Sequence, residues 1–531
     1  MTELAKRIAS FLRRNKFLSI FIANAVLMTY VLCFLPVRFE ENDDICMLLI
    51  SSGSYSGTPD AHLIFINYIY GIILKLLYSG WMGVEWYALS FVVLHIVSIS
   101  VILFSVIKST ENIMLKFIFA LLFYSVELQV LLHLQFTTTA ALVCLAGLVL
   151  LLEPQPYRRI TGVMLCVIGS WLRLEIALVV LSVSFPLFIR EMLEYKRLRF
   201  SQPLAYLGIA ILLIGAFEVV DQASYGEENG WKAYVAYNKV RGQINDNPAA
   251  PALIDRLPPA IKPVDYALLL RFFQDGTVLN IGKLNLVVNE LKLVNMLNKS
   301  IVSLFLYKKY MFILAFILLL SIMSCKAQTD VFVLLATIFI FSLIMCTMAL
   351  IVSLKYRIFI SILSPLIYSI YRSVKIIKVN FFSKLLPSSL VLLFLYSADY
   401  SYQFIGQNNY LKGKVFEQYG FIADYMVHSN NILVPYAADY RTEGTPIFSV
   451  SKMHFKRRMF FGGWLTNVPL NKGYYTSHYD FTKEHSLFLR QASRNILPML
   501  VESIYINYGV RVKPIVTAES EQDLIVEFKP I

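Results

Sequence analysis

Long apolar segments separated by short basic clusters constrain this chain more than any other feature of its sequence. The first segment runs from Phe17 to Pro36, and similar segments recur as far as residue 399. A helix needs about 20 mostly apolar residues to cross a bilayer. Because 57% of the 531 residues are hydrophobic and only 16% are charged, the chain is not an ordinary soluble protein. We predict a mostly α fold, a polytopic transmembrane helical bundle.

The positions of Lys and Arg orient the predicted spans, because cytoplasmic ends of membrane helices collect basic residues. The basic cluster from Lys6 to Lys16 places the N-terminus inside. Polar residues break the segment 61–84, and a crossing there would invert every basic cluster up to Arg199, so we expect interfacial helices along the outer face. This leaves about 11 crossings and places the C-terminus outside. The predicted crossings lie near 17–36, 85–107, 113–131, 136–152, 160–189 (two short helices that meet between Trp171 and Glu175), 203–220, 306–325, 331–353, 358–374 and 385–399.

Composition predicts two domains, a transmembrane domain over 1–400 and an extracytoplasmic C-terminal domain over 401–531. The first domain includes a first external loop with interfacial helices (37–84) and a large polar external loop (221–300). The second mixes short alternating apolar stretches with a helical pattern and many turn residues, which predicts a small α/β domain. Its expected elements are strands at 431–435 and 523–527, a helix near 484–508 and a hairpin turn at Gly462-Gly463-Trp464.

Several function classes find no support in the sequence. The residues behind the net charge of +13 lie in short clusters between apolar segments, where topology explains them without nucleic-acid binding. The six cysteines lack C-x-x-C spacing, so neither a disulfide framework nor a zinc site is indicated. The motifs of metalloproteases, P-loop ATPases, dinucleotide-binding proteins and serine hydrolases are absent. We predict no metal site, although the need for a cofactor, including a divalent cation, stays open.

A dense acidic stretch follows the first predicted span, with five carboxylates between Arg38 and His62: Glu40, Glu41, Asp43, Asp44 and Asp60. Solvation where the chain leaves the membrane explains any single one of them. Asp43 and Asp44 are adjacent, however, and two like charges raise each other's pKa unless they share a cation or a reacting proton. We predict that one of this pair, Asp43 in preference to Asp44, is a general base at the water–membrane interface.

Charged groups from two other regions are predicted on the same outer side. Arg173 and Glu175 lie inside an apolar hairpin, where ions usually face a cavity or pair with each other. Tyr356 and Arg357 lie at the outer end of a later span. A structural ion pair explains the first two equally well, and headgroup anchoring explains Arg357. Taken together they suit an anionic phosphate, because the planar guanidinium binds its oxygens in a bidentate manner.

Two weaker features surround these candidates. His62 lies close to Asp60 and either shapes an acceptor pocket or serves a surface role. The loop 221–300 carries Trp231, Tyr234 and Tyr237, aromatic residues that stack well on sugars, but a structural cap explains them equally well. His95 and His133 lie in or beside apolar spans and are interpreted as core residues.

The arrangement of a first helix, a loop with paired acids, surface helices and an outer C-terminal domain is similar to the GT-C superfamily of membrane glycosyltransferases. Asn42-Asp43-Asp44 matches the loop motif that carries the catalytic acid in that superfamily. The stretch 171–178 resembles its Arg-x-acid segment, with Leu174 in place of the usual proline. The stretch 356–365 resembles its late Arg–Tyr segment, with the two residues in reversed order.

The resemblance implies an inverting glycosyl transfer in the plasma (inner) membrane of a bacterium, as part of polysaccharide biosynthesis for the cell envelope. The expected partners are membrane lipid, a polyprenyl-phosphate sugar donor and a glycan or glycolipid acceptor. Two alternatives stay open: a polymerase or ligase of lipid-linked glycans, and a transporter or flippase, which would need helices broken near the midplane. The residues expected at the site are Asp43 and Asp44 for catalysis and Arg173, Glu175, Arg357, Tyr356, Asp60 and His62 for substrate binding.

Overall fold

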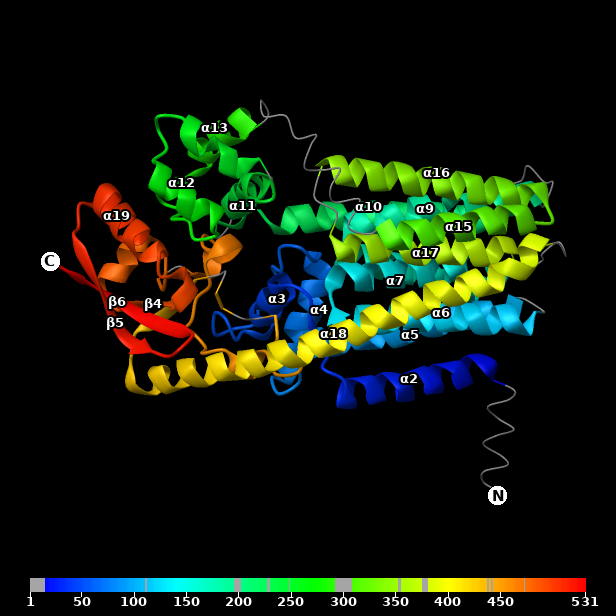
Figure 1. Ribbon diagram of the computed structural model, residues 1–531, viewed down its shortest axis with the longest axis horizontal. Coiled ribbons are helices and arrows are strands. Elements are labelled where there is room, and N and C mark those ends of the chain that lie inside the picture. Colours follow the sequence, from blue (N-terminus) through cyan, green and yellow to red (C-terminus); the bar gives the residue numbers. More distant parts are fainter. Residues whose placement is uncertain are drawn as a thin grey trace, which may run out of the picture.

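The protein is described by a computed structural model that covers residues 15–109, 112–194, 202–226, 230–247, 249–291, 308–351, 355–374, 381–436, 439–440, 443–471 and 473–531. It confirms the predicted fold class, a mostly α bundle with a small α/β C-terminal domain. Figure 1 shows the apolar helices side by side in one bundle, with the C-terminal sheet beyond one end of it.

The bundle has a helix at each predicted span: α2 (Lys16–Phe34), α5 (Trp86–Ser109), α6 (Ile113–Leu132), α7 (Phe136–Leu151), α8 (Pro156–Leu172), α9 (Leu174–Glu194), α10 (Gln202–Ser224), α15 (Lys308–Ser324), α16 (Gln328–Ile351), α17 (Tyr356–Val374) and α18 (Phe381–His428). By length and composition, seven helices in the described part of the chain can cross a membrane, while α7 and α15 are apolar but shorter. The predicted junction of two short helices falls at Arg173, between α8 and α9.

Helix α7 lies at the centre of the bundle, since every residue from Phe136 to Leu151 is buried. It packs closely on α8 because two glycines face each other. A Cβ atom on Gly147 would lie 2.7 Å from the carbonyl oxygen of Gly162, and one on Gly162 would lie 2.7 Å from the carbonyl oxygen of Gly147. Small residues allow helix backbones to approach in this way within membranes.

The segment 37–84, which the sequence predicts as the first external loop, is more ordered than a loop, and we keep the name first external region for it. It contains β1 (Arg38–Phe39), α3 (Asn42–Ser52) and α4 (Tyr68–Gly80), and β1 pairs in parallel with β2 (His133–Leu134). The sequence predicted the acidic pair on a loop, but both residues lie in the first turn of α3. Carboxylates are favourable there because the unpaired amides of a helix N-terminus carry partial positive charge.

The external segment predicted as a polar loop over 221–300 is also helical. It contains α11 (Trp231–Asn245), η2 (Ala250–Arg256), α12 (Pro263–Leu270) and α13 (Ile281–Leu291). These helices enclose their own apolar core, which includes Tyr237, Ile244, Leu253, Tyr266 and Leu284. We call the described residues between 231 and 291 the helical module.

The C-terminal sheet has the strand order β3-β4-β6-β5, from β3 (Ile432–Pro435), β4 (His485–Arg490), β5 (Val512–Glu519) and β6 (Asp523–Pro530). Strands β3 and β4 are parallel, and the other two pairings are antiparallel. The predicted strands at 431–435 and 523–527 are therefore confirmed. Helix α19 (Ile496–Tyr508) lies beside the sheet, and short turns η3 (Ser451–Met453), η4 (Gly463–Leu465), η5 (Pro469–Asn471), η6 (His478–Thr482) and η7 (Gln491–Ser493) connect the rest.

Two boundary predictions in this region are wrong. The last span was expected to end at 399, but α18 continues without a break to His428 (Figure 1). Its outer half keeps one buried face, because residues 401, 408, 415 and 422 are all buried at a spacing of seven. The helix predicted over 484–508 begins only at Ile496, because residues 485–490 pair with β3 and β6.

Candidate active site

Asp44 is an internal anchor for α3. Its Oδ1 atom accepts hydrogen bonds from the Tyr87 hydroxyl (2.8 Å) and from the backbone amide of Phe136 (3.1 Å). The residue is fully buried, and burial raises the pKa of Asp44 well above its ordinary value. These contacts join the first turn of α3 to α5 and to the start of α7, so they give Asp44 a structural role.

Asp43 has different surroundings although it is the next residue. It is only partly buried, and burial raises the pKa of its carboxyl group, an effect that Glu41 strengthens. The positive charges of Arg357 and Lys355 oppose the rise, as does the Trp464 indole. Asp43 is thus an acid with a raised pKa among cationic groups, a setting that suits a proton acceptor.

Arg357 reaches the acidic stretch from the first turn of α17. Its Nη1 atom forms an ion pair with Glu41 Oε1 at 2.5 Å. Tyr356, the preceding residue, is turned elsewhere: its hydroxyl donates to Gln129 and its ring stacks on Tyr400 with centroids 5.9 Å apart. The structure therefore pairs Arg357 with Glu41, two residues before Asp43, and directs Tyr356 into the packing between α6 and α18.

Arg173 lies at the junction of α8 and α9. Its Nε atom pairs with Glu175 Oε2 at 2.9 Å. Its guanidinium carbon lies 5.6 Å from the ring centroid of Phe136 and 5.9 Å from that of Phe65, within the range of cation–π attraction. Phe136 is also the residue whose amide donates to Asp44, so Arg173 and Asp44 share this neighbour.

Phe65 connects Arg173 to the C-terminal domain, because its ring also contacts the Trp464 ring edge to face at 5.1 Å. The backbone before it is strained: Ile64 has a φ of +71°, a conformation that β-branched residues rarely adopt. The Tyr225 hydroxyl accepts a hydrogen bond from the Ile64 amide at 2.9 Å, which helps to hold this conformation. Strain of this kind is typical of segments whose position matters for function.

Trp464 is the site residue that the sequence did not predict. The hairpin expected at Gly462-Gly463-Trp464 is instead the short turn η4, in which Gly463 has a φ of +68°. The helical module holds this turn: the Tyr234 hydroxyl donates to the Trp464 carbonyl (2.9 Å), and the Gln274 amide donates to the Gly463 carbonyl (2.7 Å). No local signal marks Trp464, since its role follows from a contact with a residue more than 400 positions away.

Asp60 and His62 form a neighbouring cluster. His62 Nδ1 lies 2.7 Å from Asp60 Oδ1, and the imidazole stacks on the Trp231 ring with centroids 4.4 Å apart. Burial alone would raise the pKa of Asp60, but the hydrogen bonds from His62 lower it overall. The cluster joins the first external region to α11, and Trp231 contacts Tyr234, whose hydroxyl donates to the turn η4.

The two histidines interpreted as core residues are indeed internal. His95 is fully buried and contacts Glu127 (2.8 Å) and Thr139 (2.9 Å), and His133 contacts Asn408 (2.9 Å). Within the described ranges, no group of three or more His, Cys, Asp and Glu side chains is placed to hold a metal ion.

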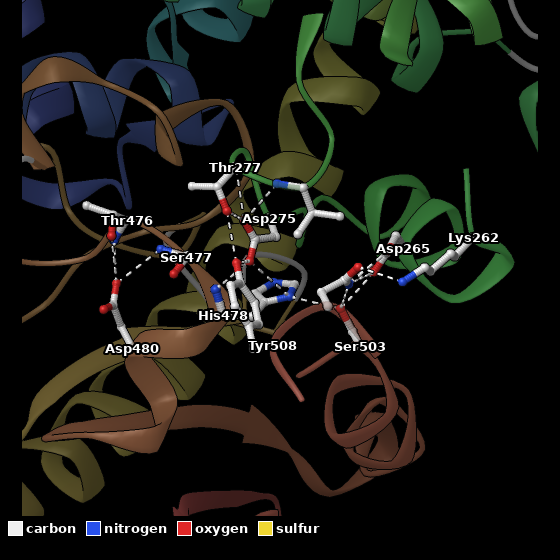
Figure 2. Close-up of polar contacts among 12 residues, drawn as sticks. Lys262, Asp265, Asp275, Thr277, Thr476, Ser477, His478, Asp480, Ser503 and Tyr508 are labelled. Atoms are coloured by element: carbon white, nitrogen blue, oxygen red, sulfur yellow. Dashed lines mark hydrogen bonds and ion pairs between the residues drawn. The ribbon is translucent and has the colours of Figure 1, made fainter. Parts of the chain in front are cut away.

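A second polar cluster joins the helical module to the C-terminal domain (Figure 2). Asp275 accepts hydrogen bonds from the Tyr508 hydroxyl (2.6 Å) and the His478 amide (2.8 Å). Asp265 accepts from the Ser503 hydroxyl at 2.7 Å. Ser503 also lies 3.5 Å from His478. Both residues are buried, and the serine hydroxyl donates its hydrogen bond to Asp265, so these residues do not form a nucleophilic triad. We call this cluster the clamp.

No protein-family model matches the chain, and no curated protein matches it. Two crystal structures are similar to it in overall fold, both of ArnT from Cupriavidus metallidurans. The one bound to undecaprenyl phosphate has a TM-score of 0.41 and 10% identity, and covers 96% of this chain and 98% of that chain. The apo structure has a TM-score of 0.42 and 10% identity, and covers 97% and 98%.

Proposed function

We propose that this protein is a membrane glycosyltransferase that moves a sugar from a polyprenyl-phosphate-linked donor to a glycan or glycolipid acceptor on the outer side of the plasma membrane. One observation carries the proposal. Asp43 is partly exposed and lies two residues after Glu41, which pairs with Arg357 at 2.5 Å, whereas the contacts of Asp44 are internal.

In the proposed reaction, an acceptor hydroxyl attacks the anomeric carbon of the donor sugar and gives its proton to Asp43. The bond between that carbon and the phosphate oxygen breaks, and its electron pair leaves with the polyprenyl phosphate. Attack from the face opposite the phosphate inverts the configuration. Arg357 and Arg173 stabilise the charge that develops on the departing phosphate, as preorganised cations do in other transfer reactions.

Each arginine has a carboxylate partner in the free protein. Glu41 pairs with Arg357 at 2.5 Å, and Glu175 pairs with Arg173 at 2.9 Å. A donor phosphate offers the same bidentate oxygen geometry as a carboxylate. We therefore infer that the phosphate replaces Glu41 and Glu175 when the donor binds. The Glu175 side chain is 65% exposed, so it can move fully into solvent at a small cost in free energy.

A paired substitution tests the proposal. Asp43→Asn removes the proton acceptor, and general-base catalysis contributes about 10²- to 10⁴-fold, so we expect sugar transfer in membranes supplied with a polyprenyl-phosphate sugar to fall by at least 100-fold while expression is kept. Asp44→Asn is the matched control. It keeps an acceptor oxygen for Tyr87 and Phe136, and we expect lower thermal stability with a smaller loss of rate. Full transfer by Asp43→Asn would remove the general base from the mechanism.

A further inference from the structure

A pocket of about 130 Å³ lies where α2, β1 and α18 meet the loop 444–448. It is close to the outer end of the first span and is distinct from the residues assigned to the active site. The loop approaches α18 closely because a Cβ atom on Gly444 would lie 2.3 Å from the Leu411 carbonyl oxygen. Arg38 also bridges to Pro446 through the backbone. The pocket is therefore a formed part of the fold.

Two cationic side chains line this pocket. Arg38 is buried, and its Nε donates to Asn408 Oδ1 at 2.6 Å while Nη1 donates to the carbonyls of Phe39 (2.9 Å) and Glu40 (3.3 Å). Its other terminal nitrogen, Nη2, has no partner among the described residues. Lys412, one turn further along α18 from Asn408, is exposed and also lines the pocket. An arginine fixed by three acceptors presents its remaining donors in a set direction.

The other walls are apolar and continue onto the membrane surface. Leu32, Leu35 and Phe448 line the pocket. On the outer face of α2, Phe34 is 71% exposed and Tyr30 is 57% exposed, which fits contact with acyl chains at a bilayer boundary. The pocket thus combines fixed positive charge with an apolar side that leads toward lipid.

We propose that this pocket binds the phosphate headgroup of an anionic phospholipid, with Arg38 Nη2 and the Lys412 ammonium on the phosphate oxygens and the acyl chains along α2. Basic pockets between membrane helices recognise lipid phosphates by this chemistry. Glu443 has the largest electrostatic effect of any carboxylate on Arg38, but it is exposed and does not line the pocket. The balance at the pocket wall is therefore positive, which disfavours a headgroup that carries its own cation.

Native mass spectrometry of the detergent-solubilised full chain tests this proposal, because it counts bound lipids and does not depend on sugar transfer. The protein is titrated with phosphatidylglycerol and, separately, with the zwitterionic phosphatidylcholine. We expect tighter binding of phosphatidylglycerol, weakened about tenfold by Arg38→Gln and by Lys412→Gln, which is the effect of losing one charge-assisted hydrogen bond. Lys414→Gln is the matched control, since Lys414 pairs with Glu417 at 2.8 Å on the same helix.

Lys412→Gln keeps the test decisive if Arg38→Gln fails to fold, because Lys412 is exposed. Equal binding of the two lipids, or phosphatidylglycerol binding that Lys412→Gln leaves unchanged, would overturn the proposal. The proposal would also be overturned if undecaprenyl phosphate displaced phosphatidylglycerol and Lys412→Gln abolished the binding of both lipids. The pocket would then belong to the donor site. A failure of Asp43→Asn to lower sugar transfer would leave this result untouched.

Discussion

At the scale of single residues, the site depends on how charges around Asp43 set its pKa. Burial raises that pKa, and Glu41 raises it further. A base must be ionised, so the transfer rate should rise with pH as Asp43 loses its proton. Glu41→Gln removes one negative charge, and we expect the lower limb of the pH–rate profile to move toward acid. Glu40 has a pKa raised to about 7 by burial, so Glu40→Gln is the control that identifies the titrating group. An unmoved profile in Glu41→Gln would contradict the assignment.

Substitution of Trp464 should move the same pH–rate profile in the opposite direction. Its indole lowers the pKa of Asp43, although its Nε1–H group forms no hydrogen bond with a described residue. Trp464→Phe keeps the ring against Phe65 but removes the N–H group, so we expect the lower limb to move toward alkaline pH. The measurement is the rate of sugar transfer between pH 5 and 9. Loss of rate at every pH with no movement of the limb would mean that Trp464 acts only by packing.

At the scale of elements, Asn408 makes α18 the support for the first external region. Its side chain accepts from Arg38 (2.6 Å) and contacts His133 (2.9 Å), and it donates to the carbonyls of Pro36 (2.9 Å) and Leu132 (3.0 Å). Asn408→Ala leaves buried polar groups unpaired, a loss on the order of 3 kcal/mol. We expect a clearly lower thermal unfolding temperature in detergent. Asn409→Ala, at an exposed position next to it, should change stability by less than about 0.5 kcal/mol.

The elements that the sequence predicted well are those with a local signal. Apolar length and basic clusters located the bundle helices, and the polar break at Arg173 located the junction of α8 and α9. The outer half of α18 was missed because its buried face is made partly of Ser401, Asn408 and Gln418, which no hydropathy pattern marks. Strand β4 was missed because its pairing with β3 and β6 is long-range.

The site was predictable in part for the same reason. The acidic pair and the out-of-place Arg173 and Arg357 are visible as charges beside apolar segments. Tyr356 was grouped with Arg357 although successive helix residues differ in direction by about 100°, and the structure turns it toward Gln129. Trp464 and Phe65 gain their roles only when distant segments meet.

At the scale of the whole molecule, the clamp connects the helical module, which contacts the turn carrying Trp464, to the C-terminal domain. The helical module holds η4 through Tyr234 and Gln274, and the clamp fixes the module to the C-terminal domain through Asp265 and Asp275. A Cβ atom on Gly276 would lie 1.9 Å from the Asn467 side chain, which would have to move. We therefore expect the position of Trp464 to depend on contacts at the far side of the module.

Acid should weaken the clamp, and the sign follows from its two central groups. Burial lowers the pKa of His478 below 6.5, so below that pH the unfolded clamp takes up a proton that the folded one does not, and stability falls. Burial alone would raise the pKa of Asp275, but contacts with His478, Tyr508 and Thr277 lower it overall. The contribution of Asp275 to stability is present above its ordinary pKa, and it is lost as the pH falls through the lower pKa of the folded state. Both groups therefore make the clamp less stable as the pH falls.

We expect amide hydrogen exchange in α11 and residues 463–467, corrected for intrinsic rates, to be faster at pH 5 than at pH 7.5. Asp275→Asn should give fast exchange at both pH values, because the neutral amide no longer accepts from Tyr508 and the His478 amide with the strength of a carboxylate. The same variant should lower sugar transfer although Asp275 does not touch Asp43, since Gln274 beside it holds the Gly463 carbonyl. Asp255→Asn, at an exposed position of the same module, should change neither. Exchange that is faster in Asp275→Asn while transfer stays normal would show that the turn carrying Trp464 keeps its place without the clamp.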